Sequence, residues 1–287
     1  MYHKQIHTNV IVVFQLIKTC FIFACFALCF KVSGMRIVFV FSNSVNWQNV
    51  LILHPIMAND YFKFKQFTVR QDRCAMKVGT DGTLLGSWAN GGESVLDVGT
   101  GTGLIALMMA QRFPCAKITA IDISNDAFLQ AEENVLASPY SDRISVLNVA
   151  FQQLPHSIYD SIVCNPPFFE NSLLCPDPER SMARHAQALP FSDLLGGVRN
   201  MLSDNGEFSV IIPSDYKKRL DEEVYLAGLF PARICAVKTT PRKHPRRYLL
   251  SYTKQKQMVE QSVVCLQDEY GKRTQWYEAL TKDFYIK

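Results

Sequence analysis

The feature that most limits the fold of this chain is a regular alternation of strand-like and helix-like segments that begins near Glu93. Short runs of Val, Ile and Leu are followed by longer segments with helical periodicity, a pattern typical of a parallel sheet covered by helices on both faces. We expect strands at 94–98, 117–122, 144–149, 159–164 and 207–212, helices at 103–112, 124–137, 191–202 and after residue 214, and a closing antiparallel pair at 233–237 and 248–252. The chain is therefore predicted to contain one doubly wound α/β domain.

A glycine-rich loop follows the first predicted strand and leads directly into a helix. Its sequence, D-V-G-T-G-T-G over 97–103, has glycines where a sharp turn and a close backbone approach to a ligand would need them. The spacing G-x-G-x-G differs from the G-x-G-x-x-G of dinucleotide sites. It suits S-adenosylmethionine, a nucleoside cofactor without phosphate. We expect Gly99, Gly101 and Gly103 to line this cofactor and Asp97 to meet its cationic methionine end.

The second predicted strand ends in a carboxylate, Asp122, about 20 residues after the glycines. A carboxylate at this place can accept hydrogen bonds from both ribose hydroxyls, and Ile123 can pack on the adenine ring. Alternatively, Asp122 caps the following helix, a role for which Ser124 is also suited.

The fourth predicted strand ends in Asn165, Pro166, Pro167 and Phe168. An exocyclic amine is a poor nucleophile because its lone pair is delocalised into the ring. The Asn165 side-chain oxygen and the Pro166 carbonyl can accept its two N–H groups and turn the lone pair toward a methyl donor, while the prolines stiffen the loop. Phe168 offers a ring on which an extruded base can stack. Alternatively, these residues form a simple proline turn.

The loop at 97–103 and the N-P-P-F segment together resemble a class I amino-methyltransferase. The segments F-K-Q-F at 64–67 and D-R-C-A-M-K-V-G-T-D-G at 72–82 narrow the resemblance to the bacterial tRNA1(Val) adenine-37 N6-methyltransferases, from about residue 61 to 287. The resemblance implies a Rossmann-like sheet of seven strands with an antiparallel last strand, and methylation of N6 of adenine 37, beside the anticodon. It also implies that residues before the first strand fold over the cofactor, so Lys77, Thr80 and Asp81 are candidate cofactor contacts.

Two positions depart from the pattern of such enzymes. Phe151 stands where they often have an Asp that accepts from the cofactor adenine, so adenine recognition here would depend on backbone groups and packing. Phe168 stands where some relatives have Tyr, which keeps the stacking ring and loses a hydroxyl.

The densest basic run predicts the contact with RNA phosphates. It consists of Arg242, Lys243, His244, Arg246 and Arg247, between the two closing strands. Local basic patches matter because residues 57–287 are formally neutral, and the net charge of +4 comes from 1–56. We expect the anticodon stem-loop of a tRNA as the partner and a monomeric enzyme.

Residues 1–56 contain no Asp or Glu and include a nearly apolar stretch at 10–30. We interpret them as an extension outside the fold that reflects a misassigned start, with translation from Met57; the alternatives are a membrane anchor and a cleaved signal peptide. The nine cysteines show no zinc-site spacing, which predicts a cytoplasmic protein with reduced thiols and no metal.

Two other reactions use the same Asn-Pro-Pro-aromatic motif: methylation of guanine N2 in ribosomal RNA and methylation of a glutamine N5 in a protein. A non-enzymatic alternative is an inactive RNA-binding module.

Overall fold

The computed structural model describes residues 27–32, 35–40, 52–55, 60–74, 76–167 and 189–286. The chain divides into two compact units, Met1–Ala58 and Asn59–Lys287. In the first unit the described residues form a three-stranded antiparallel sheet of β1 (Ala27–Val32), β2 (Met35–Val40) and β3 (Ile52–Pro55). Most of the apolar stretch at 10–30 lies outside the described residues. Across the described ranges, no helix is long and apolar enough to cross a membrane.

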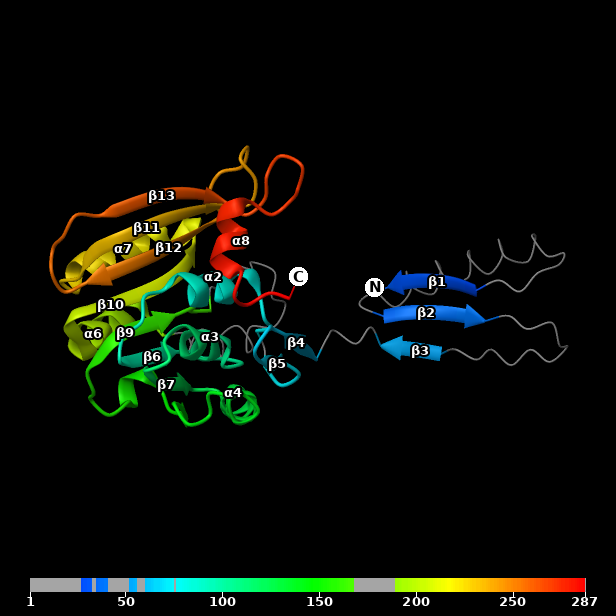
Figure 1. Cartoon of the computed structure of the whole chain (residues 1–287), viewed down its shortest axis with the longest axis horizontal. Coiled ribbons are helices and arrows are strands. Elements are labelled where there is room, and N and C mark those ends of the chain that lie inside the picture. The colour runs from blue at the N-terminus through cyan, green and yellow to red at the C-terminus, as the bar shows by residue number, and fades with distance from the viewer. Residues whose placement is uncertain are drawn as a thin grey trace, which may run out of the picture. The chain divides into compact units, whose positions relative to one another are not determined.

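The second unit is built on an eight-stranded sheet in the order β13-β11-β12-β10-β9-β6-β7-β8 (Figure 1). In chain order the strands are β6 (Ser94–Val98), β7 (Lys117–Asp122), β8 (Ile144–Asn148), β9 (Tyr159–Cys164), β10 (Leu202–Pro213), β11 (Phe230–Lys238), β12 (Arg247–Thr253) and β13 (Glu260–Cys265). Only β12 runs against its neighbours, pairing antiparallel with β10 and β11. The predicted seven strands with an antiparallel last member are present as β6 to β12.

The eighth strand corrects the predicted count. β13 pairs parallel with β11, from Arg233↔Glu260 to Lys238↔Cys265, and forms an edge of the sheet. Its first four residues are exposed. The segment therefore lacks the apolar pattern that marks a buried strand, and pattern reasoning missed it.

Helices cover both faces of the sheet, as predicted (Figure 1). They are α2 (Thr80–Trp88), α3 (Leu104–Arg112), α4 (Asn125–Leu136), α6 (Phe191–Met201), α7 (Lys217–Leu226) and α8 (Gln275–Thr281). Apolar side chains of α2 and α3, such as Leu84 and Met108, form one core cluster. Those of α6 and α7, such as Leu194 and Leu220, form a second. The sequence had not predicted α2 or α8.

The C-terminal residues hold the start of the second unit. A hairpin of β4 (Tyr61–Lys63) and β5 (Thr68–Arg70) precedes α2. The Lys65 amide donates to the Phe284 carbonyl at 2.9 Å, and the Phe64 ring stacks on Tyr285 with centroids 6.0 Å apart. These contacts join the two ends of the unit. They hold the β4–β5 hairpin in place, and with it the start of the segment that connects β5 to α2.

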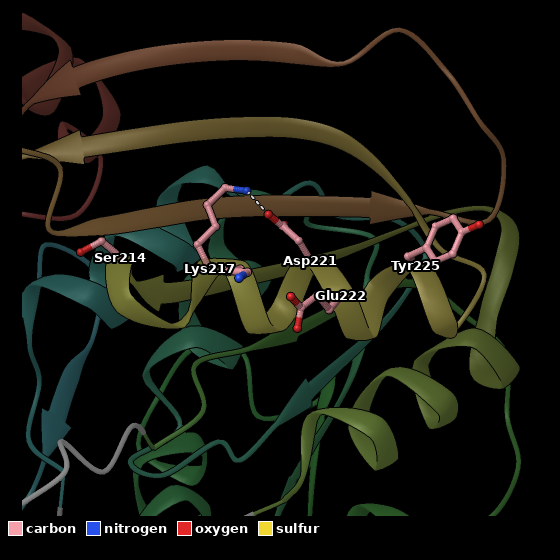
Figure 2. Close-up of a pocket in the computed structure, with 6 residues that line it drawn as sticks. Ser214, Lys217, Asp221, Glu222 and Tyr225 are labelled. Carbon is pink, nitrogen blue, oxygen red and sulfur yellow. Dashed lines mark hydrogen bonds and ion pairs between the residues drawn. The ribbon is translucent and has the colours of Figure 1, made fainter.

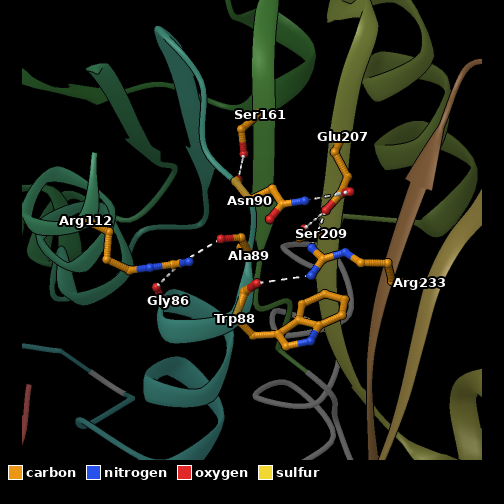
Figure 3. Close-up of polar contacts among 9 residues, drawn as sticks. All are labelled: Gly86, Trp88, Ala89, Asn90, Arg112, Ser161, Glu207, Ser209 and Arg233. Carbon is orange, nitrogen blue, oxygen red and sulfur yellow. Dashed lines mark hydrogen bonds and ion pairs between the residues drawn. The ribbon is translucent and has the colours of Figure 1, made fainter. Parts of the chain in front are cut away.

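Two arginines close the C-terminal end of α2 (Figure 3). Arg112 Nη1 donates to the carbonyls of Gly86 and Ala89, at 2.9 and 2.6 Å, which satisfies groups that a helix end leaves unpaired. Arg233 stacks over the Trp88 ring, with its guanidinium carbon 3.8 Å from the centroid, and pairs with Glu207 on β10. Burial, helped by the nearby Arg233, lowers the pKa of Arg112 to about 10. This network anchors α2 to β10 and β11.

Two adjacent glycines of α6 provide a matched test of this packing. A Cβ at Gly196 would meet open space, whereas a Cβ at Gly197 would overlap the ring of Phe151. We expect Gly196→Ala to stabilise the protein by up to about 1 kcal/mol through helix propensity, and Gly197→Ala to destabilise it by about 1–3 kcal/mol through overpacking. Urea unfolding of both variants measures the difference. Equal effects of the two substitutions would contradict this account.

Candidate functional site

The candidate site lies where three parallel strands end side by side. β6 lies between β7 and β9, and Val98 pairs in register with both Ile121 and Cys164. Because the strands are parallel, the segments that follow them leave at the same edge of the sheet. The glycine loop and Asn165 are therefore brought together at the point where the strand order reverses, the usual place for a ligand in an open α/β sheet.

The glycine loop is held open by left-handed backbone. Gly99, Gly101 and Gly103 have φ of 71°, 57° and 79°, a region that favours glycine. A Cβ at Gly99 or Gly101 would meet nothing within 4 Å, whereas one at Gly103 would touch Ala131 of α4. The first two glycines thus leave space above the backbone, and the third allows α3 to begin close to α4.

Asp97 lies fully buried beneath this loop. Its Oδ2 accepts from the Thr100 hydroxyl at 2.7 Å and from the Ala106 amide at 3.2 Å, while Oδ1 has no hydrogen-bond partner. Burial raises the pKa of Asp97 to about 7, despite the hydrogen bonds from Thr100 and Ala106 that favour the anion. A buried carboxylate oxygen without a partner is a group that a cationic ligand would satisfy.

Asp122 fastens the loop from the neighbouring strand. Its Oδ2 accepts from the Gly101 amide and its Oδ1 from the Ser124 amide, both at 2.9 Å. The carboxylate is half-buried, and each oxygen retains a further lone pair. The Ser124 hydroxyl caps α4 by accepting from the Ala127 amide at 3.4 Å, so helix capping does not depend on Asp122 alone. Ile123 is 57% exposed at the same edge.

The predicted acceptor corner directly follows β9. Asn165 is partly exposed, Pro166 is buried and Pro167 is exposed. The Asn165 amide nitrogen donates to the Met76 sulfur at 3.8 Å. The fourth predicted member, Phe168, lies outside the described residues.

Met76 belongs to the segment that connects β5 to α2, and we term its described residues, 71–74 and 76–79, the strap. α4 anchors it: Asn134 Oδ1 accepts from the Arg70 amide, and Gln130 Oε1 accepts from the Arg73 amide. Asn134 Nδ2 also donates to the Thr102 carbonyl in the glycine loop, at 2.8 Å. The strap therefore runs from the cofactor side of the site to Asn165.

Sequence reasoning missed both anchors. Gln130 and Asn134 are buried in α4, 0% and 1% exposed, and lie one helical turn apart. A polar pair at i and i+4 on the inner face of an amphipathic helix was a detectable signal, because buried polar groups need partners. Lys77 is exposed and Thr80 half-buried where the strap meets α2.

Comparisons with known proteins show the family of the chain. Residues 82–225 match the model of the Methyltransferase small domain family. The chain is 44% identical over 235 residues to the tRNA1(Val) (adenine(37)-N6)-methyltransferase of Bacteroides thetaiotaomicron, covering 80% of this chain and 99% of the relative. The enzymes of the same name from Phocaeicola vulgatus and Trichodesmium erythraeum are 46% and 43% identical, each over 80% of this chain and 99% and 100% of the relative.

The chain belongs to the tRNA1(Val) (adenine(37)-N6)-methyltransferase family. Among solved structures, a predicted O-methyltransferase, Atu636 from Agrobacterium tumefaciens, is similar at a TM-score of 0.56 and 19% identity, covering 71% of this chain and 96% of the other. That likeness supports the Rossmann-like fold.

In this family member the basic run divides into two parts. Arg242, Lys243, His244 and Arg246 are exposed in the loop between β11 and β12. The loop lies at the edge of the sheet that carries the candidate site, because the Ser214 amide, just after β10, donates to the Arg246 carbonyl at 3.0 Å. Arg247 differs, since it forms an ion pair with Asp81 of α2 at 2.7 Å.

Two further features lie outside the candidate site. Phe151 is buried in the core beside α6, so its ring packs in the interior.

A shallow depression of about 650 Å³ lies along the outside of α7 (Figure 2). It is lined by Ser214, Lys217, Lys218, Asp221, Glu222 and Tyr225. Lys217 pairs with Asp221 within it, and no residue of the glycine loop or acceptor corner contributes. In the part of the chain that the structure describes, no cluster of three potential metal ligands occurs.

The buried Asp97 gives a testable pH dependence. Its raised pKa means that between about pH 4 and pH 7 the folded state holds a proton that the unfolded state releases. Asp97 therefore makes the free energy of unfolding fall as pH rises through this range, by at most roughly 1.4 kcal/mol per pH unit. We expect Asp97→Asn to remove this contribution. Chemical unfolding at several pH values measures it, and identical pH profiles for variant and wild type would contradict the assignment.

Proposed function

We propose that this methyltransferase transfers the methyl group of S-adenosylmethionine to the exocyclic N6 of adenine 37 in tRNA1(Val). The observation that carries the proposal is the juxtaposition of two loops on neighbouring strands: the glycine loop after β6 and the Asn165–Pro167 corner after β9. The names of relatives at 43–46% identity support adenine 37 of tRNA1(Val) as the acceptor.

The residues present fit the cofactor. The unpartnered Oδ1 of buried Asp97 suits a cationic methionine ammonium, and the open space over Gly99 and Gly101 suits a ligand that contacts backbone. Asp122 retains lone pairs for ribose hydroxyls, and the exposed Ile123 offers an apolar surface for adenine. When bound, S-adenosylmethionine supplies an electrophilic methyl group on a sulfonium.

Further cofactor contacts are proposed on three other residues. Gly103 starts α3 at the end of the loop, and Lys77 and Thr80 lie where the strap meets α2. Asp81 stands beside them, but its ion pair with Arg247 favours a different role, developed below.

The acceptor amine is held by hydrogen-bond acceptors at the corner. Because the Asn165 amide nitrogen faces the Met76 sulfur, the side-chain oxygen is the atom left to accept an N–H of the amine. The Pro166 carbonyl accepts the second N–H, and the two prolines keep the corner rigid. Phe168 would stack on the base. The methylated nitrogen is acidic and loses its proton to water, so positioning supplies most of the rate.

The exposed cations of the β11–β12 loop would bind phosphates of the anticodon stem-loop. Arg242, Lys243, His244 and Arg246 form a local basic surface on a unit, residues 57–287, that is formally neutral as a whole. Binding through such contacts weakens steeply with salt. We also propose that residues 57–287 carry this activity by themselves, because relatives covered over 99–100% of their length match only 80% of this chain. A tRNA substrate, as in the names of these relatives, favours action in the cytoplasm.

The direct test is methylation of unmodified transcripts with labelled S-adenosylmethionine, followed by nucleoside identification. We expect N6-methyladenosine in tRNA1(Val) and none in a transcript with guanine at position 37. Label in guanine N2 of ribosomal RNA, in a protein glutamine, or nowhere would contradict the proposal.

Substitution of the acceptor residue separates chemistry from cofactor binding. We expect Asn165→Ala to lower kcat by at least about a hundredfold, since it removes an acceptor that orients the amine, while the cofactor Kd stays near the wild-type value. Asn205→Ala, on an exposed asparagine at the start of β10, serves as the control and should change neither quantity. Isothermal titration and single-turnover assays measure them. An equal loss of kcat and cofactor affinity would argue against this role.

Two glycines with the same backbone conformation test the cofactor loop. Gly101 and Gly271 have φ of 57° and 78°, and a Cβ at either would meet open space. Alanine at each should cost about 1–2 kcal/mol of stability. We expect Gly101→Ala to weaken S-adenosylmethionine binding in addition, because its methyl group would occupy the space above the loop, and Gly271→Ala to leave binding unchanged. Titration calorimetry beside thermal melting checks both; unaltered affinity in Gly101→Ala would remove the loop from the site.

A further inference from the structure

Asp81 and Arg247 connect two parts of the molecule with different tasks. Asp81 lies in the first turn of α2, and its Oδ1 is 2.7 Å from Arg247 Nη1 at the start of β12. Their side chains are 45% and 23% exposed, but the Asp81 Oδ1 that faces the arginine is itself buried, and its contact with Arg247 is an ion pair without a hydrogen bond. Burial raises the pKa of Asp81, and the Arg247 guanidinium opposes that shift.

Each partner is rigidly attached to one functional segment. On one side, Arg247 follows the β11–β12 loop with its exposed cations, which we term the basic loop. Two hydrogen bonds close the base of this loop, from the Arg246 amide to the Val237 carbonyl and from the Ser214 amide to the Arg246 carbonyl. On the other side, Asp81 lies two residues after the strap, in which the Met76 sulfur contacts the Asn165 amide nitrogen. One ion pair therefore connects the basic loop with the segment that contacts the acceptor corner.

We propose that Asp81 and Arg247 are a positioning pair that sets the strap, and through it Asn165, relative to the bound tRNA. The inference rests on the proposed function and deepens it, because it gives both residues a positioning role and makes neither a ligand of the tRNA or of the cofactor. Arg247 is neutralised by its partner, so it adds little to the attraction for phosphate that its exposed neighbours supply. The Asp81 carboxylate pairs with the arginine and does not bind the cofactor.

This role differs from a contribution to folding. Exposed or half-exposed ion pairs add little to the stability of a folded protein. A small displacement of a positioned group, by contrast, lowers the rate of a reaction that depends on orientation. Loss of the pair should therefore appear in kcat more than in thermal stability or in tRNA affinity.

The experiment compares Asp81→Asn, Arg247→Gln and the charge-swapped double variant Asp81→Arg/Arg247→Asp in methylation of a tRNA1(Val) transcript over a range of salt. Arg246→Gln, on the exposed cation next to Arg247, is the matched comparison for phosphate binding. Asp204→Asn, which breaks the pair between the largely covered Lys254 and the exposed Asp204, is the control for loss of an ion pair outside the candidate site. Thermal melting and S-adenosylmethionine titration accompany every variant.

We expect each single variant at 81 or 247 to lower kcat by about tenfold, with the cofactor Kd and the salt dependence of the tRNA KM unchanged. The swapped double variant should recover part of the loss, and Asp204→Asn should equal wild type. Arg246→Gln should instead raise the tRNA KM and reduce its salt dependence. If the swapped variant does not fold, Arg247→Lys should retain more kcat than Arg247→Gln.

Three results would overturn the inference. Arg247→Gln could behave as Arg246→Gln does, which would make Arg247 a phosphate ligand. Asp81→Asn could weaken cofactor binding while Arg247→Gln does not, which would make Asp81 a cofactor ligand. All variants could match an active wild type, which would leave the proposed function intact and remove the pair from it. A wild-type enzyme inactive on the transcript would overturn the proposed function and this inference together.

Discussion

The candidate site depends on the parallel register of β6 with its two neighbours. Val98 pairs with Ile121 on one side and with Cys164 on the other, so three chain segments leave the sheet at one level. The first brings the glycine loop, the second Asp122 and the third Asn165. Backbone hydrogen bonds far inside the core thus determine the spacing of groups that act at its edge. A shift of one residue in either pairing would also turn buried side chains toward the wrong face.

Two carboxylates preorganise the loop from below and from the side. Asp97 holds Thr100 and the first turn of α3 from within the core, and Asp122 holds the Gly101 amide from the adjacent strand. A backbone with three residues at positive φ would otherwise be mobile, and ordering it on binding would reduce affinity. Keeping a carboxylate buried has an energetic cost, which is visible in the raised pKa of Asp97. Such local cost is common where a structure is arranged for a ligand.

The strap extends this preorganisation to the acceptor side. The buried side-chain amides of Asn134 and Gln130 in α4 accept hydrogen bonds from the backbone just before and just after the start of the strap. Asn134 also donates to a carbonyl of the glycine loop. The same few side chains therefore adjust the cofactor loop and the segment against Asn165 together. At the far end of α2, the stacked Arg233 and Trp88 anchor the helix to the sheet, so the first turn with Asp81 is held from both sides.

The sequence by itself determined the alternating α/β order, the limits of β6, β7 and β9, and the loop and corner that follow them, because these features depend on periodicity and local residue types. It could not reveal that Arg247 faces Asp81, that Gln130 and Asn134 hold the strap, or that an exposed segment forms β13. Those contacts join residues between 27 and 166 positions apart in the chain, and no local pattern encodes which residues become partners. Tertiary packing decides such pairings, because a side chain's partner is set by which distant elements the sheet brings beside it.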